Sequence, residues 1–207
     1  MIKITLKDGS QKEYQNPISI IGLAAELSEG LARVACVGMV NGEIKDLRYV
    51  ISEDSEVNIL TFQDEEGKKA FRHTASHILA LAVKRLFPDT KLAIGPAIDD
   101  GFYYDFDREG SFSYEDLEKL EGEMKKIVKE DLKLERFELP RAEAIKLMED
   151  INEPYKVELI NDLPEGSIIS FYRMGEFTDL CAGPHLMSTK YVKAFKLTHT
   201  AGAYWRG

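Results

Sequence analysis

The chain has 207 residues, of which 44% are hydrophobic and 30% charged, as in an ordinary globular protein with one large domain or two modest ones. Its formal net charge of -9 argues against general nucleic-acid binding, which needs an excess of lysine and arginine, but leaves room for one local contact. It has no apolar segment long enough to span a membrane, no signal-peptide pattern and only two, distant cysteines, so we expect a protein of the reducing cytoplasm.

The first sixty residues predict a small domain of their own. Apolar residues alternate with polar ones from Ile2 to Leu6, and Asp8-Gly9 supplies a tight turn into a second strand, which together form a β-hairpin. A short helix is expected near Ser19 to Leu27. Further strands follow in VACVGMV and SEVNILTF, with a turn at Asn41-Gly42. This order is that of a β-grasp, ubiquitin-like fold over residues 1–62.

A helix carrying two histidines follows. The acidic run that starts at Asp64 is suited to a helix N-terminus, and the helix should end before Pro88. In RHTASHILALAVKRLF the apolar residues recur at helical spacing. His73 and His77 fall on the side opposite that apolar stripe, so we expect them to face a cleft and not the core.

The rest of the chain mixes strands and helices, so the sequence predicts an α+β domain over residues 63–207. LAIGPAIDDGFYYDFD reads as a hairpin that turns at Asp100-Gly101 and places Tyr104 on an aromatic face. A capping box starting at Ser113 opens an amphipathic helix, and Pro140 begins another that runs through Met148. From residue 166 onward we expect mainly extended chain, broken by a loop at CAGPH.

A second short motif, CAGPH, lies about a hundred residues after the histidine helix. Cys181 and His185 have the same spacing as the helical pair, but Gly183 and Pro184 between them favour a loop. If this loop and the helix converge, three imidazoles and one thiol surround one small volume.

Such a quartet permits several kinds of chemistry. One cysteine and three histidines form an acceptable ligand set for tetrahedral zinc. Without a metal, the imidazoles can hold or activate a water molecule, and hydrogen-bond donors can stabilise an oxyanion. A nucleophilic Cys181 ranks third, and four unrelated polar residues remain an alternative. Asp179, Tyr104 and Lys156 could orient a small polar substrate, or could be ion-pair and packing residues.

The residues around these motifs resemble a known family. FRHTASHILALAVKRLFPDTKLAIGPAIDDGFYYDFD and FTDLCAGPHLMSTKYVKAFKLTHTAGAYWRG are similar to the N-terminal region of bacterial threonyl-tRNA synthetases. The resemblance covers the whole chain. Residues 1–62 resemble the TGS domain. Residues 63–207 resemble the editing domain that these enzymes share in outline with alanyl-tRNA synthetases. Whether this editing domain is truncated at its C-terminal end stays open.

The resemblance implies hydrolysis of the ester in seryl-tRNA(Thr), the mischarged product, by attack of water. Serine lacks one methyl group of threonine, and a binding pocket gains only about 1–3 kcal/mol from a group of that size, so errors must be removed at a second site. In the family the chain continues past AGAYWRG into a catalytic domain that binds ATP, threonine and zinc. None of that domain is in this sequence, so we expect no aminoacylation by this chain.

The resemblance also implies roles for individual residues. His73 and His77 match the pair beside the terminal adenosine and the water, and His73 is expected to engage the ribose hydroxyl near the ester. Cys181 and His185 match the facing loop. The positions that hold the seryl group and water are matched by Lys156 and Asp179, with Tyr104 as a further substrate contact. Alanyl-type domains hold zinc on the same quartet, but the threonyl type is metal-free, so no metal and no cofactor are expected here.

Two other functions stay open at this point. The chain could be a non-catalytic tRNA-binding or regulatory module, or a zinc-dependent, free-standing deacylase of the alanyl type. The expected partner is the acceptor end of tRNA(Thr) carrying serine. Because the family forms homodimers through parts that are absent here, this chain is expected to be a monomer.

Overall fold

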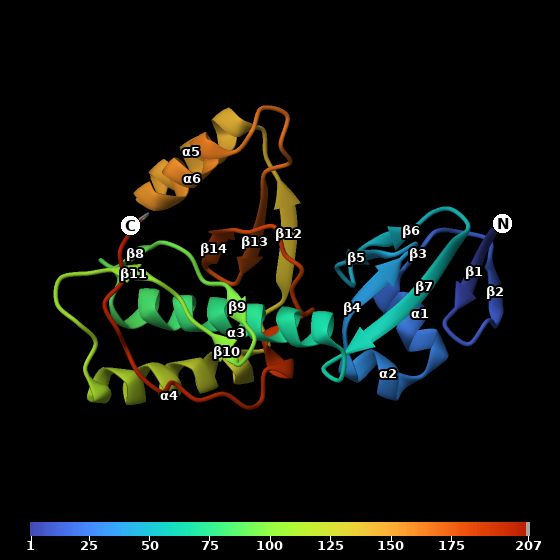
Figure 1. Ribbon diagram of the computed structural model, residues 1–207, viewed down its shortest axis with the longest axis horizontal. Coiled ribbons are helices and arrows are strands. Elements are labelled where there is room, and N and C mark those ends of the chain that lie inside the picture. The colour runs from blue at the N-terminus through green and yellow to red at the C-terminus, as the bar shows by residue number, and fades with distance from the viewer. Residues whose placement is uncertain (206–207) are drawn as a thin grey trace. The chain divides into compact units, whose positions relative to one another are not determined.

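The computed structural model describes residues 1–205 and combines helices with strands (Figure 1), which confirms the predicted α+β class. The final two residues of the predicted second domain lie outside the described residues. The chain divides into two compact parts. The first comprises Met1–Thr74 together with Gly183–Met187, and the second comprises residues 75–182 and the chain from 188 onward. None of the helices within residues 1–205 has the length and apolar character needed to cross a membrane.

A five-stranded sheet with the order β2-β1-β7-β4-β5 forms the first part. The predicted hairpin is confirmed, since β1 and β2 pair antiparallel and Gly9 in their turn has φ +86°. β1 also pairs with β7, in parallel. The strands are β1 (Ile2–Leu6), β2 (Gln11–Tyr14), β4 (Ala35–Val40), β5 (Glu43–Lys45) and β7 (Ser55–Thr61), and a separate pair is formed by β3 (Ile18–Ser19) and β6 (Val50–Ile51).

Two short helices complete this β-grasp arrangement. α1 (Ile20–Leu27) occupies the predicted position, with the Ser19 side chain accepting a hydrogen bond from the Gly22 amide. α2 (Glu29–Val34) was not predicted, because its six residues carry no buried side chain and so no apolar stripe. Apolar residues of β1, α1, β4, β6 and β7 and Leu47 form the core of this part.

The histidine helix is α3 (Glu65–Leu86), which begins with two acidic residues and ends before Pro88, as predicted. Every residue from 74 to 83 is buried, so the helix is covered around its whole circumference over this stretch. Its sequence had indicated one buried stripe and one open face. The expectation of an open face was wrong. The face opposite the apolar stripe carries small and hydroxyl side chains, including Ala80 and Ser76, and other segments of the chain can pack closely against it.

The aromatic hairpin is confirmed but is interrupted. β9 (Ala97–Ile98) pairs with β10 (Gly101–Phe102), and β8 (Lys91–Leu92) pairs with β11 (Phe106–Asp107). The turn lies at Asp99 and Asp100, one residue earlier than predicted, because Gly101 already pairs with Ile98. The Tyr104 ring lies directly on Gly95, where an added Cβ would come within 2.1 Å of that ring. Only glycine fits there.

The remaining elements of the second part are three helices, a three-stranded antiparallel sheet and one 3₁₀ turn. The capping box of α4 (Tyr114–Glu130) is confirmed, and α5 (Arg141–Asp150) starts one residue after Pro140. The sheet has the order β12-β13-β14. The expectation of mainly extended chain to the end holds only as far as Leu180, since the later residues are irregular. The elements not yet named are α6 (Pro154–Asp162), β12 (Leu134–Glu138), β13 (Ser170–Met174), β14 (Phe177–Leu180) and the 3₁₀ turn Thr189–Tyr191.

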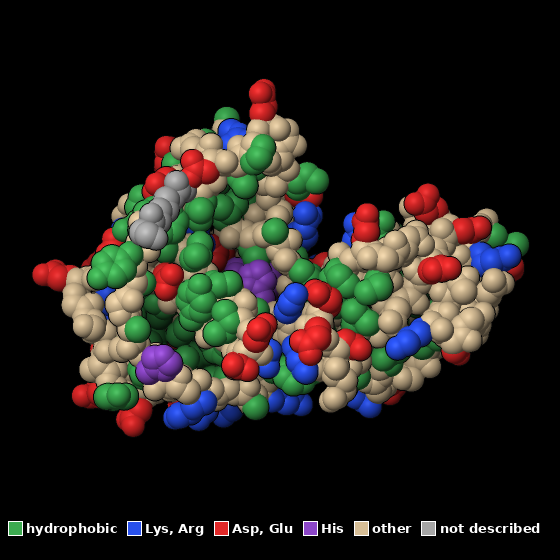
Figure 2. All heavy atoms as spheres, in the orientation of Figure 1, with side chains coloured by type: hydrophobic (Ala, Val, Ile, Leu, Met, Phe, Trp, Pro, Cys, Tyr) green, Lys and Arg blue, Asp and Glu red, His purple; other side chains and the backbone are tan. Residues whose placement is uncertain are grey.

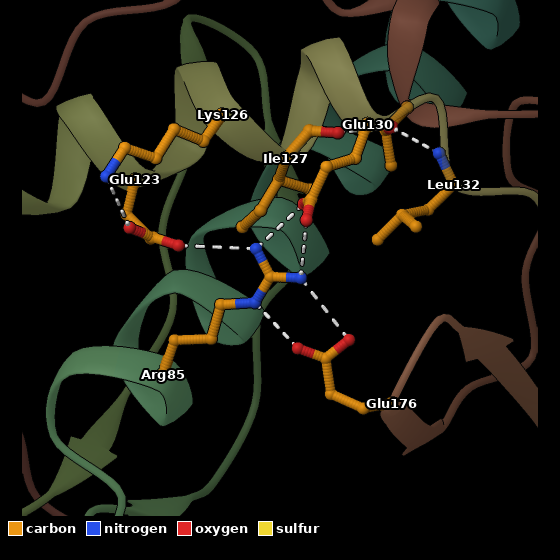
Figure 3. A network of polar contacts seen from close by, with 8 residues as sticks. Arg85, Glu123, Lys126, Ile127, Glu130, Leu132 and Glu176 are labelled. Carbon is orange, nitrogen blue, oxygen red and sulfur yellow. Dashed lines mark hydrogen bonds and ion pairs between the residues drawn. The ribbon is translucent and has the colours of Figure 1, made fainter.

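Figure 2 shows that the acidic side chains are spread over the visible face and not gathered on one element. One group of carboxylates in the second part does converge, on the last turn of α3 (Figure 3). The Arg85 guanidinium bonds Glu176 Oε1 at 2.6 Å, at the turn between β13 and β14. It also bonds Glu130 Oε2 at 2.8 Å and Glu123 Oε1 at 3.2 Å, both on α4. The hydrogen bond to Glu176 and these further carboxylates raise the pKa of Arg85, so it stays charged and ties three elements together.

We expect Arg85→Ala to lower the free energy of unfolding of the second part by about 1–3 kcal/mol, since several charge-assisted hydrogen bonds are lost and three carboxylates are left without their shared cation. Urea unfolding followed by the fluorescence of Trp205, the single tryptophan, measures this. The control is Lys119→Ala, which removes an exposed i,i+4 pair with Glu115 and should cost less than about 0.5 kcal/mol. Equal effects of the two substitutions would contradict the assigned role of Arg85.

Candidate functional site

A buried carboxylate lies at the centre of the polar cluster in the second part. Asp179, on β14, is only 2% exposed. Its Oδ2 accepts a hydrogen bond from Tyr104 Oη at 2.6 Å and lies 3.6 Å from His77 Nε2. Lys156 Nζ lies 3.0 Å from its Oδ1 as an ion pair, although no hydrogen bond of good angle reaches that oxygen from the described residues. Four of the seven predicted site residues thus meet here.

The charges of this cluster can be assigned from its contacts. Burial raises the pKa of Asp179, but the Lys156 ammonium, His77 and the Tyr104 hydroxyl outweigh that effect and lower it below its ordinary value. Burial and the adjacent Asp179 charge hold the pKa of Tyr104 well above its ordinary value. Asp179 is therefore a carboxylate and Tyr104 a neutral donor near pH 7. Because the pKa of Asp179 is lower in the folded than in the unfolded chain, its ionisation stabilises the fold at pH values above about 4. This contribution is lost as the pH falls further.

Helix α6 places Lys156 in this cluster. Pro154 occupies the first turn of the helix, a position where the missing amide proton has no consequence. Glu153, just before it, is 2% exposed and accepts hydrogen bonds from Lys84 of α3 and from the Leu92 amide of β8. The start of α6 is thereby fixed to two other elements. Lys156, 3% exposed, projects from its first turn and lies 5.3 Å from the centre of the Tyr104 ring.

His77 is part of the interior. It is 3% exposed, and its ring meets those of Phe177 and Tyr104 edge-on, with centroid distances of 6.0 and 6.4 Å. The prediction that both helix histidines face a cleft was therefore wrong for His77. His73 is half-buried. The aromatic residues that cover His77 come from β14 and the hairpin, far away in sequence, so the local pattern of α3 could not indicate them.

His185 and His73 lie together in the first part. Their rings stack with centroids 4.1 Å apart and planes inclined by 28°. His185 is fully buried, and its Nδ1 lies 3.0 Å from the hydroxyl oxygen of Thr74. The Thr74 hydroxyl donates to the Ala70 carbonyl at 3.0 Å and accepts from the Leu186 amide at 3.0 Å.

These contacts select a tautomer for His185. A hydroxyl has one proton and two lone pairs. The proton goes to the Ala70 carbonyl and one lone pair to the Leu186 amide, so the second lone pair is left for a donor. All three hydrogen bonds of the Thr74 hydroxyl are satisfied when His185 carries its proton on Nδ1, which places the ring lone pair on Nε2. The Nε2 lone pair can then accept a hydrogen bond or a proton.

Cys181 directly follows β14, and its main chain is held firmly. Its amide donates to the Ser170 carbonyl at 3.0 Å, and the Ser170 hydroxyl donates to its carbonyl at 2.7 Å. The thiol belongs to a residue that is 8% exposed. A nucleophilic thiol needs access to its substrate, and this burial limits that access.

The four residues of the sequence motifs are divided between the two parts of the structure. His73 and His185 belong to the first part, and His77 and Cys181 belong to the second. One cysteine and three histidines are an acceptable ligand set for tetrahedral zinc. Within the first part, however, the planes of the stacked His73 and His185 rings are nearly parallel, so their in-plane lone pairs do not converge on one ion unless a ring rotates.

Comparisons with known proteins bear on this site. Residues 2–61 match the TGS domain family, and residues 169–206 match the family described as the threonyl and alanyl tRNA synthetase second additional domain. All 207 residues align with the threonine–tRNA ligase of Acetivibrio thermocellus at 69% identity. The corresponding ligases of Clostridium perfringens (strain SM101) and Clostridioides difficile are 64% and 61% identical, again over the whole chain.

The chain joins a TGS domain to a synthetase second additional domain. It corresponds to the N-terminal part of threonine–tRNA ligases and spans about a third of their length. The family resemblance read from the sequence is confirmed, and so is an editing type of second domain. The roles of the seven site residues and the boundary at residue 63 stay predictions.

Sequence reasoning missed three side chains near the editing motifs. Thr74 bonds the His185 ring, and Asp46 and Arg48 of the TGS domain bond the loop that carries His185. Thr74 sits beside His73 in the sequence, so its position was a usable signal. Asp46 and Arg48 lie about 140 residues from that loop, and nothing in a single sequence links them to it.

We expect Thr74→Val, which keeps the side-chain shape but removes the hydroxyl, to release His185 from the Nδ1-protonated tautomer. Nitrogen-15 NMR of the imidazoles should show a protonated Nδ1 and a bare Nε2 for His185 in the parent chain, and a mixture of tautomers in Thr74→Val. Thr74→Ser keeps the hydroxyl and should retain the parent spectrum. A bare Nδ1 on His185 in the parent chain would contradict the assignment.

Proposed function

We propose that this chain is a proofreading module that hydrolyses the ester of mischarged seryl-tRNA(Thr), with a water molecule as the nucleophile. The observation that carries the proposal is the buried cluster of Asp179, Lys156, Tyr104 and His77. Buried opposite charges stabilise a fold poorly, because desolvation offsets their attraction, so a cluster of this kind is better explained by a binding or catalytic role.

The two charges suit the aminoacyl group of such a substrate. A carboxylate whose pKa is lowered accepts hydrogen bonds well but is a weak general base. In the proposal, Asp179 therefore holds the α-ammonium group of the seryl moiety or a water molecule, through Oδ1, and does not take a proton. Lys156 has two further N–H donors beside its contact with Asp179, and these can stabilise the oxyanion that forms when water attacks the ester.

The histidines supply the remaining roles. In the proposal, His73 engages the ribose hydroxyl beside the ester, and a water held by His73, Lys156 and Asp179 attacks the carbonyl carbon. His185, with a lone pair on Nε2, can accept a hydrogen bond from the substrate or from water. Cys181, held on both sides by Ser170, forms a wall. Such rigid walls can exclude the additional methyl group of threonine while admitting serine.

A second candidate is a zinc-dependent deacylase of the alanyl type. It is favoured by the chemistry of the quartet, since one cysteine and three histidines are acceptable ligands for tetrahedral zinc. If bound there, zinc would lower the pKa of a water molecule and polarise the ester carbonyl. The stacked arrangement of His73 and His185 makes the metal-free site the better supported of the two.

The test is single-turnover hydrolysis of seryl-tRNA(Thr) and threonyl-tRNA(Thr) by the purified chain in excess. We expect release of serine with little release of threonine. Asp179→Asn and Lys156→Met should each slow serine release by about 100-fold or more, because an electrostatic contact to the reacting group is lost. Their matched controls are Asp107→Asn, which removes the charge of an exposed carboxylate that accepts from Tyr155, and Lys146→Met, which removes an exposed partner of Asp150. Both controls should behave like the parent chain.

Three results would contradict the proposal: no serine release above buffer, equal rates for the two substrates, or full activity of Asp179→Asn. The zinc content of the active protein separates the two candidates. The metal-free site predicts hydrolysis that is unchanged by chelators. One zinc per chain that is lost on Cys181→Ala, together with activity, would instead establish the second candidate.

A further inference from the structure

The loop Gly183–Met187, which carries His185, packs with the TGS domain and clusters with it in the first part of the structure. Two TGS side chains hold its main chain. The Arg48 guanidinium donates to three consecutive carbonyl groups of the loop, those of residues 185, 186 and 187, at 3.4, 2.8 and 3.1 Å. The Asp46 carboxylate accepts from the His185 amide at 3.3 Å.

Asp46 and Arg48 act as a pair. Arg48 Nη1 lies 2.5 Å from Asp46 Oδ1, and the same carboxylate oxygen accepts from the Arg48 amide at 3.0 Å. Their side chains are only 10% and 19% exposed. A planar guanidinium with five N–H donors can bond a carboxylate and several carbonyl groups at once, which a lysine ammonium in its place could not match.

The TGS main chain at this point is rigid. Leu47, between the two polar residues, is 1% exposed and belongs to the core of the first part. Its carbonyl accepts a hydrogen bond from the Ile21 amide, and the Asp46 carbonyl accepts one from Tyr49. Asp46 and Arg48 therefore project from a fixed segment, and their reach into the loop does not depend on a mobile surface chain.

The main-chain groups of the loop are paired largely with side chains and not with a strand or helix. It lies outside the strands and helices, and Gly183 in it has φ +75°. His185 and Leu186 are 0% and 2% exposed, so their polar main-chain groups need partners within the protein. Arg48 and Asp46 supply these partners, and Thr74 supplies one for the Leu186 amide. Without the TGS pair, the segment that positions the His185 ring against His73 would lose the four hydrogen bonds that Arg48 and Asp46 make to its main chain.

We propose that Asp46 and Arg48 are positioning residues for His185, and that the TGS domain thereby serves as part of the scaffold of the editing site. The effect on hydrolysis rests on the function proposed above. The effect on the loop and on the His185 ring does not, so the two can fail separately.

The experiment compares the parent chain with Arg48→Ala and Arg48→Lys. Arg33→Ala is the matched control, because Arg33 is exposed on α2 of the same domain and pairs only weakly with Glu29, at 3.9 Å. Amide exchange reports the order of the loop through His185 and Leu186. The imidazole NMR signals report the ring of His185, with exposed His199 as the internal reference.

In Arg48→Ala we expect amide exchange of His185 and Leu186 to be faster by about tenfold or more, as for the loss of a charge-assisted hydrogen bond. The His185 signals should shift while those of His199 stay in place. The kcat for serine release should fall by about tenfold or more with little change in KM. Arg48→Lys keeps the charge and should give a smaller effect in the same direction. If Arg48→Ala does not fold, the readouts of Arg48→Lys test the proposal in its place. Arg33→Ala should match the parent in every readout.

Unchanged loop exchange and unchanged His185 signals in a folded Arg48 variant would overturn the proposal. So would a loosened loop with hydrolysis at the parent rate. If the parent chain releases no serine, the function proposed above fails, and the exchange and NMR readouts alone then decide whether the TGS pair positions His185.

Discussion

Removing the charge of Asp179 from water costs several kcal/mol, and the surrounding structure is arranged to offset that cost. Lys156 supplies the opposite charge, Tyr104 donates a hydrogen bond and His77 lies within reach. Each of these groups comes from a different element: α6, the aromatic hairpin and α3. The positions of those elements relative to β14 are therefore constrained by one carboxylate, and much of the second part can be understood as support for it.

That support extends beyond the direct contacts of Asp179. Glu153 ties the first turn of α6 to α3 and β8, which limits where the Lys156 ammonium can lie. Gly95 leaves room for the Tyr104 ring, since any side chain at that position would collide with it. Arg85 joins the end of α3 to α4 and to the turn before β14. A cluster held in this way changes little when a substrate arrives, which favours catalysis by fixed charges.

The local features of this structure could be predicted from the sequence, whereas its long-range contacts could not. The histidine helix, the first hairpin and the Ser113 capping box follow from spacing, turn residues and caps, all of which act within a few positions. The burial of His77 could not be read in this way, because Phe177 covers it from a hundred residues away. The contacts of Arg48 with the loop that carries His185 are hidden for the same reason. The functional assignment of Lys156 and Asp179 came from family resemblance, and their pairing became visible only in the fold.

The most direct test of this account is the ionisation of Asp179 in the folded chain, followed by carbon-13 NMR of its carboxyl group during an acid titration. We expect the midpoint of this titration to lie below the ordinary value for an aspartate, about 3.9, because the pKa of Asp179 is lowered. In Lys156→Met, the midpoint should move above that value, because burial then dominates. An Asp179 that is already protonated above pH 4 in the parent chain, or a midpoint that Lys156→Met leaves unchanged, would contradict the claim that this charge pair organises the site.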